Sequence, residues 1–279
     1  MSAKSAVLIT GCSSGIGEST ARAFLAAGHP VYATARRPET LGALEKAGAR
    51  VLALDVTDER SMASAVAEVE AEHGAVGVLV NNAGYGEYGP VEEVALERVR
   101  RQFETNVFGA VRMAQLVLPG MRREGGGSIV NIGSMGGRFT FPAGGFYHAS
   151  KYALESLTDA LRFETAPFGV RVSLIEPGLI RTGFGGTAAG TLASDPGRAT
   201  GPYAALNKAA DKAMTEGYAN RTMTAGPEAV ATAVLKAATS ARPRHRYVIT
   251  PAARALIHLR RLGGSRVFDA LLRRQFATS

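Results

Sequence analysis

The chain has 279 residues, 46% of them hydrophobic, so it is long enough to bury the core of one large α/β domain or of two small ones. Its formal net charge is +8, and residues 241–279 supply all of it through nine arginines against one acid. A neutral main segment argues against a nucleic-acid-binding core. The basic end predicts a C-terminal surface element.

A cytoplasmic location is predicted from what the sequence lacks. No apolar run reaches the ~18 residues that a membrane-spanning helix needs. Gly11 and Cys12 end the first apolar stretch, so no cleavable signal peptide is expected. Cys12 is the single cysteine and cannot form an intrachain disulfide, which suits a reducing compartment. The histidines at 29, 73, 148, 245 and 258 lack metal-ligand spacing, so no metal site is predicted.

Short apolar runs alternate with helical stretches through the first 180 residues, and Val, Ile and Leu fill these runs with little alternation. The expected strands are Ala6–Thr10, Val31–Ala35, Val51–Leu54, Val78–Asn81, Ser128–Ile132 and Arg171–Ile175. The expected helices are 15–28, 38–47, 58–73, 92–124 with a break near Thr105, and 146–168. This pattern predicts an α/β fold: a single-domain, doubly wound (Rossmann) parallel sheet of about seven strands with helices on both faces.

The alternation changes after residue 178. Residues 179–225 are rich in Gly, Ala and Thr and are long for a connection, which predicts a substrate lid. A helix at 227–240 and a last strand at Tyr247–Thr250 complete a domain of residues 1–250. Residues 251–276 look helical and basic, so residues 251–279 are expected to form an extension packed on the same domain and split into two helices at Gly263-Gly264.

A glycine-rich turn, Thr10-Gly11-Cys12-Ser13-Ser14-Gly15-Ile16-Gly17, follows the first expected strand. Glycines permit a tight turn and close approach of the backbone to a pyrophosphate, and the following helix N-terminus offers free N–H groups. A turn of this kind also serves as a plain connector. At the start of a βαβ series it favours a dinucleotide site.

Tyr147 and Lys151 lie four residues apart in an expected helix and therefore share one face. A phenol titrates near ~10, and a nearby ammonium favours the phenolate, so the pair has the features of an acid/base group tuned toward neutral pH. Such pairs also occur on ordinary exposed helix faces. Only the other motifs of the chain distinguish the two interpretations.

Further short motifs follow along the chain, most of them at the end of an expected strand. They are Asp55-Val56, Asn81-Asn82-Ala83-Gly84, Asn106 in a Thr-Asn-Val-Phe-Gly run, Ser134, and Pro177-Gly178. Together with TGCSSGIG at 10–17 and the Tyr147/Lys151 pair, their order and spacing over residues 6–182 resemble those of short-chain dehydrogenases/reductases. TGCSSGIG with the later Tyr-Ala-Thr-Ala-Arg is most similar to the 17β-hydroxysteroid and retinol dehydrogenase group. The resemblance implies hydride transfer between a nicotinamide and a carbonyl or alcohol.

The resemblance also implies roles for single residues. Tyr147 would exchange the proton, Ser134 would hydrogen-bond the substrate oxygen, and Lys151 would bind the nicotinamide ribose and depress the pKa of Tyr147. Asn106 would hold a water that links Lys151 to solvent. The residues expected at the cofactor are Gly11, Ser13, Ser14, Gly15, Ile16, Gly17, Arg36, Asp55, Val56, Asn82, Ala83, Gly84, Tyr147, Lys151, Pro177, Gly178, Ile180 and Thr182.

The end of the second expected strand favours NADP(H) over NAD(H). An acid there would bind the ribose hydroxyls and repel a 2′-phosphate, but the chain has Arg36-Arg37 and no acid before Glu39. Arg36 can pair with the phosphate, with Ser14 as a second donor. The alternative is that both arginines lie on a solvated loop.

The pocket walls are expected from Tyr85–Pro90, Met135–Phe146 and residues 179–225. Their aromatic and large apolar residues are Tyr85, Tyr88, Met135, Phe139, Phe141, Phe146 and Phe184, which favour a lipophilic alcohol or ketone. Arg138 is expected in solvent, with an acidic substrate group as the alternative, and His148 as structural or pocket-lining. Cys12 is expected to be packed and not nucleophilic.

Other functions and partners remain open. A 3-oxoacyl-thioester reductase on the same fold and a non-catalytic NADP(H)-binding sensor are the alternatives to the lipophilic substrate. The basic C-terminal segment is interpreted as a solvated amphipathic helix, a peripheral membrane contact or a subunit contact. The resemblance implies a homodimer or homotetramer formed through the helices at 105–124 and 146–168.

Overall fold

The computed structural model describes residues 5–193 and 200–276. Its centre is a parallel sheet of seven strands in the order β3-β2-β1-β4-β5-β6-β9, which confirms the predicted fold class. The strands are β1 Val7–Ile9, β2 Val31–Ala35, β3 Arg50–Ala53, β4 Val78–Asn81, β5 Gly127–Ile132, β6 Val170–Glu176 and β9 Arg246–Val248. β2 and β4 have the predicted bounds, and the other strands differ from the prediction by one or two residues at an end.

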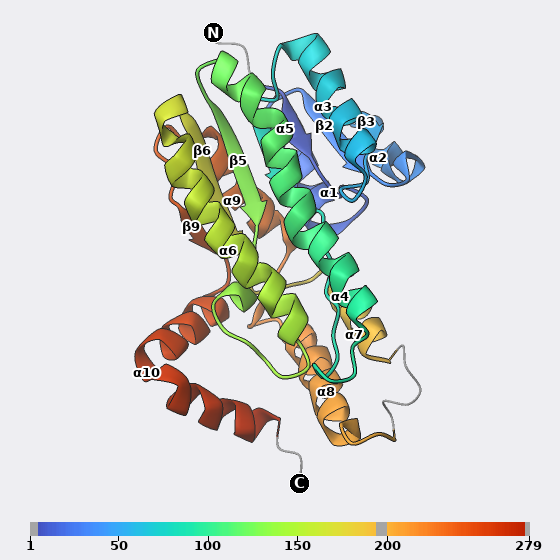
Figure 1. The fold of residues 1–279 in the computed structure, drawn as a ribbon, viewed down its shortest axis with the longest axis vertical. Helices are drawn as coiled ribbons and strands as arrows, with labels where there is room; N and C mark the ends of the chain where they lie inside the picture. The colour runs from blue at the N-terminus through green and yellow to red at the C-terminus, as the bar shows by residue number, and fades with distance from the viewer. Residues whose placement is uncertain (1–4, 194–199, 277–279) are drawn as a thin grey trace.

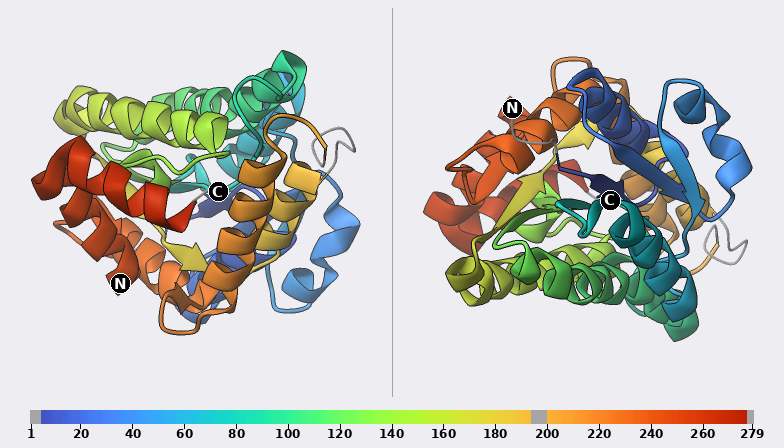
Figure 2. Two further views of the ribbon diagram at one scale, coloured as in Figure 1. Left: turned by 90° about the horizontal axis from the view of Figure 1, so that it is seen from below. Right: turned by 90° about the horizontal axis from the view of Figure 1, so that it is seen from above.

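Helices cover both faces of the sheet (Figure 1, Figure 2). One face carries α3 Glu59–His73, α5 Gly109–Arg123 and α6 Gly145–Thr165, and the other carries α1 Gly15–Ala26 and α9 Pro227–Thr239. Successive residues of a strand point to opposite faces, so Val7 and Ile9 pack in the core with α1 and α9, whereas Leu8 packs in the core with α3 and α5. The short η1 Pro38–Leu41 and α2 Gly42–Glu45 replace the predicted helix 38–47.

The predicted helix 92–124 is divided into three parts. α4 Leu96–Phe103 leads into a π-helical turn, η2 Glu104–Phe108, and α5 continues from Gly109. The extra residue of a π turn rotates the following side chains, and such turns are frequent at functional sites. Here the turn contains Asn106, whose side chain is buried.

Residues 179–225, predicted as a lid segment, contain regular structure. β7 Leu179–Ile180 pairs with β8 Thr224–Ala225 in a second small sheet. Between them lie α7 Phe184–Ala193 and α8 Ala204–Ala219, which project below the sheet on the right in Figure 1. The low density of large apolar residues in this segment concealed two helices.

The C-terminal helix α10 Pro251–Gln275 bends at Gly264, whose φ of 66° and ψ of −169° are not helical, so the predicted split is present. Its inner face packs on the loop before α6: the ring of Phe268 lies 5.3 Å from that of Phe139 and 6.3 Å from that of Phe141. α10 therefore lies at the lower end of the molecule, across from α8 (Figure 1). No helix in the described ranges is long and apolar enough to cross a membrane.

Candidate active site

A cleft of about 1080 Å³ opens at the carboxyl ends of the parallel strands. This is where open α/β sheets bind ligands. All predicted cofactor residues line it except Gly17, and so does Ser134. Gly17 and Asn106 are buried behind its wall.

The glycine turn is built for close approach of a ligand. Gly11 and Gly15 have φ of +73° and +60°, which other residues adopt with strain. A Cβ at Gly17 would lie 2.2 Å from the Gly11 carbonyl oxygen, so only glycine lets α1 begin so close to the turn. The N-cap residue Ser14 makes no side-chain capping bond, which leaves the first N–H groups of α1 without that partner. The turn therefore fits a pyrophosphate.

Thr10 and Asn82 hold this turn in place. The Asn82 amide donates to the carbonyl oxygens of Thr10 and Gly11, both at 2.8 Å. The Thr10 hydroxyl accepts from the backbone N–H groups of Asn82 and Ala83, both at 3.0 Å. Asn82 was predicted to bind the cofactor, but its amide braces the turn. No role was predicted for Thr10, although a threonine at a strand end beside a glycine turn indicates a hydroxyl that can hold the turn.

Arg36 and Asp55 line the cleft where β2 and β3 end, and they bear on the choice between NADP(H) and NAD(H). Arg36 follows β2, is exposed and lines the cleft, whereas Arg37 is exposed but does not. Asp55 after β3 accepts hydrogen bonds from the Thr57 N–H at 2.9 Å and from the Thr57 hydroxyl at 2.7 Å. The arginine and the absence of an acid at this end of β2 fit a phosphorylated ribose.

Ser134, Tyr147 and Lys151 meet in the cleft. Tyr147 and Lys151 are both buried on the first turns of α6, and the Lys151 Nζ lies 5.9 Å from the centre of the Tyr147 ring. That Nζ donates to the Ile132 carbonyl oxygen at 2.9 Å, which fixes the lysine against the end of β5. Ser134 follows β5, and its hydroxyl hydrogen-bonds the Tyr147 hydroxyl.

The pKa of Tyr147 differs from the value that the sequence predicted. Burial raises it to about 12, and the hydrogen bond with Ser134 opposes that rise. Burial also lowers the pKa of Lys151 to about 8. The predicted depression of the Tyr147 pKa by Lys151 is not seen in the chain alone, where burial dominates and Ser134 is the group that opposes it.

Asn106 lies beside Lys151, and its amide is hydrogen-bonded to the Tyr85 backbone and to the Ser150 side chain. Its Nδ2 donates to the Tyr85 carbonyl oxygen at 2.8 Å and to the Ser150 hydroxyl at 3.1 Å, and its Oδ1 accepts from the Tyr85 N–H at 3.0 Å. A Cβ at Gly84 would lie 3.0 Å from the Asn106 Oδ1 and 3.8 Å from the Lys151 Nζ, so Gly84 keeps the space between them open. The Ser150 hydroxyl in turn donates to the Tyr147 carbonyl oxygen at 2.7 Å, a link that the sequence did not suggest.

His148 connects two loops of the site. Its Nδ1 lies 2.9 Å from the Gly136 carbonyl oxygen, and its Nε2 accepts from the Phe141 N–H at 3.2 Å. Burial lowers its pKa to about 4, so the ring is neutral with the proton on Nδ1. His148 is both structural and pocket-lining, in agreement with the sequence prediction.

Two other residues have partners inside the fold. Arg138 was predicted in solvent or at an acidic substrate, and both interpretations are wrong, because its Nη1 lies 3.1 Å from the Glu176 Oε1. The partner is 38 residues away, on β6, so no local pattern reveals it. Cys12 is buried, donates to the Ile9 carbonyl oxygen at 3.3 Å and has its pKa raised to about 12 by burial, which confirms a packed thiol.

The end of the cleft around Tyr147 has aromatic walls. Tyr88 stacks on Tyr147 with ring centres 5.5 Å apart, and Phe184 lies at the same distance from Tyr147. Of the predicted wall residues, Tyr85, Tyr88, Met135, Phe141 and Phe184 line the cleft, whereas Phe139 is fully buried and Phe146 lies outside the lining. Met223 lines the cleft from the predicted wall segment 179–225. The contributions of α10 and of the residue after it were not predicted, and they are Leu256, Leu271, Gln275 and Phe276.

Comparisons with known proteins agree with this geometry. The family model described as short chain dehydrogenase matches residues 5–191. A short-chain dehydrogenase structure from Streptomyces avermitilis superposes with a TM-score of 0.81 and 34% identity, covering 98% of this chain and 97% of that one.

Three curated relatives have named activities. The chain is 45% identical over 179 residues to 3-ketodihydrosphingosine reductase of Bacteroides thetaiotaomicron, covering 64% of this chain and 65% of the relative. It is 37% identical over 256 residues to NADPH-dependent 3-dehydrocapnine reductase of Ornithobacterium rhinotracheale, covering 88% and 87%. It is 44% identical over 195 residues to 17-beta-hydroxysteroid dehydrogenase type 1 of Homo sapiens, covering 65% and 58%. The first and third alignments thus span less than two thirds of those relatives.

Proposed function

Since the chain belongs to the short-chain dehydrogenase family, we propose that it interconverts a lipophilic ketone and its secondary alcohol with NADP(H), using Tyr147 as the acid/base. As a member of this family it is an oxidoreductase that acts on CH–OH or C=O groups and binds a nicotinamide cofactor. The observation that carries the proposal is the meeting of Ser134, Tyr147 and Lys151 in the cleft that also holds the glycine turn.

The proposed chemistry divides between the cofactor and three side chains. When bound, the nicotinamide supplies or accepts the hydride at the substrate carbon. Tyr147 gives its hydroxyl proton to the carbonyl oxygen, and its pKa of about 12 keeps that proton in place at neutral pH. Ser134 donates a second hydrogen bond to the same oxygen and stabilises its developing charge. Lys151 holds the nicotinamide ribose, and its ammonium stabilises the phenolate left on Tyr147. Asn106 is proposed to hold a water between Lys151 and solvent.

The removal of the Tyr147 hydroxyl tests this assignment. Tyr147→Phe is expected to fold, to bind NADPH and to lose nearly all turnover, because only the proton donor is missing. Tyr152→Phe is the matched control, since Tyr152 is exposed on the same helix and does not line the cleft. Turnover by Tyr147→Phe close to that of the control would refute the assignment.

Arg36 carries the proposal of NADP(H). Arg36→Asp is expected to weaken NADPH binding and to leave NADH binding unchanged or stronger, because the carboxylate repels a 2′-phosphate and accepts from ribose hydroxyls. Arg37→Asp makes the same charge change at the exposed neighbour outside the cleft. Dissociation constants of both cofactors, measured for both variants by fluorescence titration, check the proposal. Equal effects of the two substitutions would mean that only the general loss of positive charge matters, and they would contradict a specific phosphate contact of Arg36.

The substrate class follows from the walls of the cleft. Phe141, Phe184, Leu256, Leu271 and Phe276 offer apolar surface in the cleft that Tyr147 lines. Pockets with such walls and few polar groups bind lipophilic compounds. Relatives named as reductases of 3-ketodihydrosphingosine and 3-dehydrocapnine support a 3-keto group on such a compound.

A substrate panel tests this class against its alternatives. NADPH consumption is measured with long-chain 3-ketones, steroid ketones, short ketones and 3-oxoacyl thioesters. The proposal expects the highest kcat/KM for the long-chain or steroid ketones. A preference for the thioesters would favour a 3-oxoacyl-thioester reductase, and tight NADPH binding without turnover on any member would favour a sensor.

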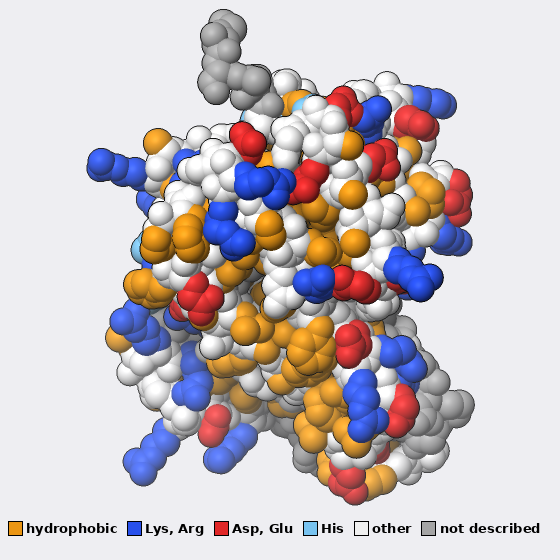
Figure 3. Space-filling view, turned by 45° about the horizontal axis from the view of Figure 1, so that its top comes forward, with side chains coloured by type: hydrophobic (Ala, Val, Ile, Leu, Met, Phe, Trp, Pro, Cys, Tyr) orange, Lys and Arg blue, Asp and Glu red, His pale blue; other side chains and the backbone are white. Residues whose placement is uncertain are grey.

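The outer face of α10 suits an anionic membrane surface. Figure 3 shows Lys and Arg side chains gathered at the lower left, the side on which α10 lies in Figure 1. Arg261 and Arg266 are exposed there on either side of Gly264, and Leu262 is 82% exposed. We propose a peripheral contact of this face with anionic lipid. Sedimentation with anionic and neutral vesicles tests it, with the double variant Arg261→Glu/Arg266→Glu as the comparison; equal sedimentation of both proteins excludes the contact.

A homodimer or homotetramer is proposed through α5 and α6. Phe163 is 69% exposed on α6, and Phe108, directly before α5, is 54% exposed. Contiguous exposed apolar patches mark interaction surfaces, and we propose that each of these rings belongs to such a patch. The molar mass in solution is expected to be at least twice that of one chain, and Phe163→Asp is expected to lower it; a monomeric wild-type protein would exclude the proposal.

A further inference from the structure

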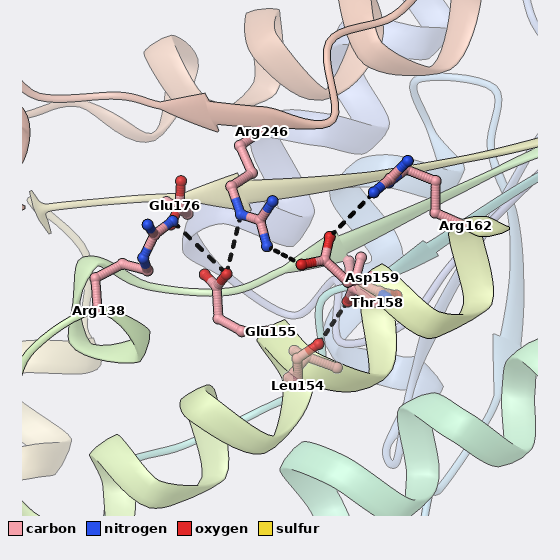
Figure 4. Close-up of polar contacts among 9 residues, drawn as sticks. Arg138, Leu154, Glu155, Thr158, Asp159, Arg162, Glu176 and Arg246 are labelled. Carbon is pink, nitrogen blue, oxygen red and sulfur yellow. Dashed lines mark hydrogen bonds and ion pairs between the residues drawn. The ribbon is translucent and has the colours of Figure 1, made fainter.

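Two buried glutamates meet one helical turn beyond Lys151 (Figure 4). Glu155 lies on α6, four residues after Lys151 and therefore on the same face, and it is 7% exposed. Glu176 is the last residue of β6 and is 1% exposed. Carboxyl groups are rarely so buried without matched partners.

Arginines contact only one oxygen of each glutamate. Arg138 Nη1 lies 3.1 Å from Glu176 Oε1 and 3.9 Å from Glu155 Oε2. Arg246 Nε on β9 lies 3.1 Å from the same Glu155 Oε2, and its Nη2 lies 2.5 Å from Asp159. The other two oxygens, Glu155 Oε1 and Glu176 Oε2, are buried and receive no hydrogen bond from any donor of the described residues.

The carboxyl groups of Glu155 and Glu176 are held close together, because the same Arg138 Nη1 contacts an oxygen of each. An ionised carboxylate has acceptors only, so two ionised groups could not hydrogen-bond each other. A proton on one of them would supply the donor that Glu155 Oε1 and Glu176 Oε2 lack. Burial, then the charge and hydrogen bond of Glu176, raise the pKa of Glu155 to about 8, while Arg246 opposes the rise.

The pair lies where three parts of the site meet. A Cβ at Gly137 would lie 2.8 Å from the Glu155 Cγ and 3.0 Å from the Lys151 carbonyl oxygen, so the turn after Ser134 packs tightly on α6. Glu176 precedes Pro177, whose carbonyl oxygen accepts from the Met135 N–H at 2.9 Å. Arg138 ends the turn that Ser134 begins.

We propose that Glu155 and Glu176 share one proton at neutral pH, and that this protonated pair is a positioning device that holds the Ser134 turn and Pro177 against α6. The glutamates touch neither substrate nor cofactor and act through the elements that they join. The proposal rests on the proposed function only in one respect: it treats the Ser134 turn and the Lys151 helix as parts of the active site. The charged groups that face the pair are Arg138 from the turn, Arg246 from β9, and Asp159 on α6, and Tyr152 on α6 faces it as a titratable group.

The sign of the pH effect follows from the raised pKa. The stability that the pair contributes is fully present below the ordinary glutamate value of 4.5 and is lost as the pH rises through about 8. Above that pH the two carboxylates repel each other, and α6 and the end of β6 separate. In the window between these values the folded chain binds up to about one proton more than the unfolded chain.

Glu155→Gln tests the proposal, because its amide can donate to Glu176 without a titrating proton. Asp159→Asn is the matched control: it removes another carboxylate bonded to Arg246 but leaves the pair intact. The free energy of unfolding is measured between about pH 6 and pH 9 for wild type and both variants. As the pH rises, wild type and Asp159→Asn are expected to lose free energy of unfolding more steeply than Glu155→Gln. The difference in slope corresponds to up to about one bound proton. The differences between proteins cancel the titration of His148 and Lys151, which are common to all three.

Two further measurements complete the test. The infrared C=O stretch of a protonated carboxyl group is expected in the wild type at neutral pH, absent in Glu155→Gln and in Glu176→Gln, and lost from the wild type at alkaline pH. NADPH binding is expected to weaken above about pH 8 in both proteins, because Lys151 titrates in both, and the loss is expected to be larger in the wild type than in Glu155→Gln. A slope and a carboxyl band equal in wild type and Glu155→Gln would overturn the shared proton. A shared proton with equal alkaline loss of NADPH binding in both proteins would overturn the positioning role. None of these readouts requires turnover, so they stand apart from a failure of the proposed reaction.

Discussion

The two ends of the cleft are built in different ways. The cofactor end is made by short motifs that directly follow strands β1 to β5, and hydrogen bonds such as Asn82 to Gly11 fix it. The substrate end is made by aromatic side chains of separate segments, Tyr88, Phe141 and Phe184, together with apolar residues of α8 and α10, which lie more than 100 residues beyond that turn. Under the proposed function, backbone geometry is expected to control cofactor binding, whereas replaceable side-chain surface is expected to control substrate binding.

The largest expected effect is at Gly17. Gly17→Ala puts a Cβ 2.2 Å from a backbone oxygen, which cannot rotate away, so the turn and α1 must move apart. NADPH binding is expected to weaken by about 100-fold or more, equivalent to about 3 kcal/mol. Gly42→Ala is the control, because a Cβ there meets nothing within 4 Å. Normal binding by Gly17→Ala would show that the cofactor end is as tolerant as the substrate end.

The direction of catalysis is expected to depend on pH through Tyr147. Reduction needs the protonated phenol and is expected to be insensitive to this group around neutral pH, because its pKa is about 12. Oxidation needs the phenolate and is expected to rise by up to about tenfold per pH unit. The kcat values of both directions, measured against pH, check this. A midpoint near neutrality in both profiles would show that the bound cofactor lowers the pKa of Tyr147.

Substitutions at the substrate end are expected to have a weaker effect than Gly17→Ala, and to change KM and not the dissociation constant of NADPH. Leu271→Ser removes apolar surface from the wall and is expected to raise KM for a lipophilic ketone about fivefold, equivalent to about 1 kcal/mol, with NADPH affinity unchanged. Ala270→Ser at the exposed neighbour serves as the control. A parallel loss of NADPH affinity would mean that the two ends are coupled.

The smallest effect is expected at Leu262, which is 82% exposed on the outer face of α10. Leu262→Ser is expected to change the free energy of unfolding by less than about 0.5 kcal/mol and to leave KM unchanged. Thermal denaturation and steady-state kinetics measure both. A clear fall in Tm would indicate that a second copy of the chain covers this residue in solution.

The fold was predictable because the buried strands of a parallel sheet appear in the sequence as continuous apolar runs. Val31–Ala35 and Val78–Asn81 stand as predicted. The interruption near Thr105 was visible, but its nature as a π turn depends on how Asn106 bonds to Tyr85 across the cleft wall. The helices in 179–225 were missed because glycine and threonine there weaken the helical pattern.

The positions of the candidate site residues were predictable, but their electrostatics were not. Ser134 lies just after the end of β5, and Tyr147 and Lys151 lie four residues apart on α6, so local spacing indicated which side chains could share the cleft. The pKa of Tyr147 depends on burial by Tyr88 and Phe184, which come from other parts of the chain. The same holds for Arg138, whose partner Glu176 lies on a neighbouring element. Sequence spacing reports local geometry, whereas desolvation and ion pairing arise only when distant segments pack.

The order of the strands has a consequence for how the chain emerges from the ribosome. β1 lies inside the sheet, β2 and β3 extend it on one side, and β4, β5, β6 and β9 extend it on the other. Every newly translated strand thus joins an open edge, and none has to insert between two strands already paired. Until β9 is made, β6 is an unpaired edge, and Glu155 and Asp159 lack Arg246. A nascent chain can therefore complete its nucleotide turn early, while its acid cluster and substrate wall wait for the final segment of translation.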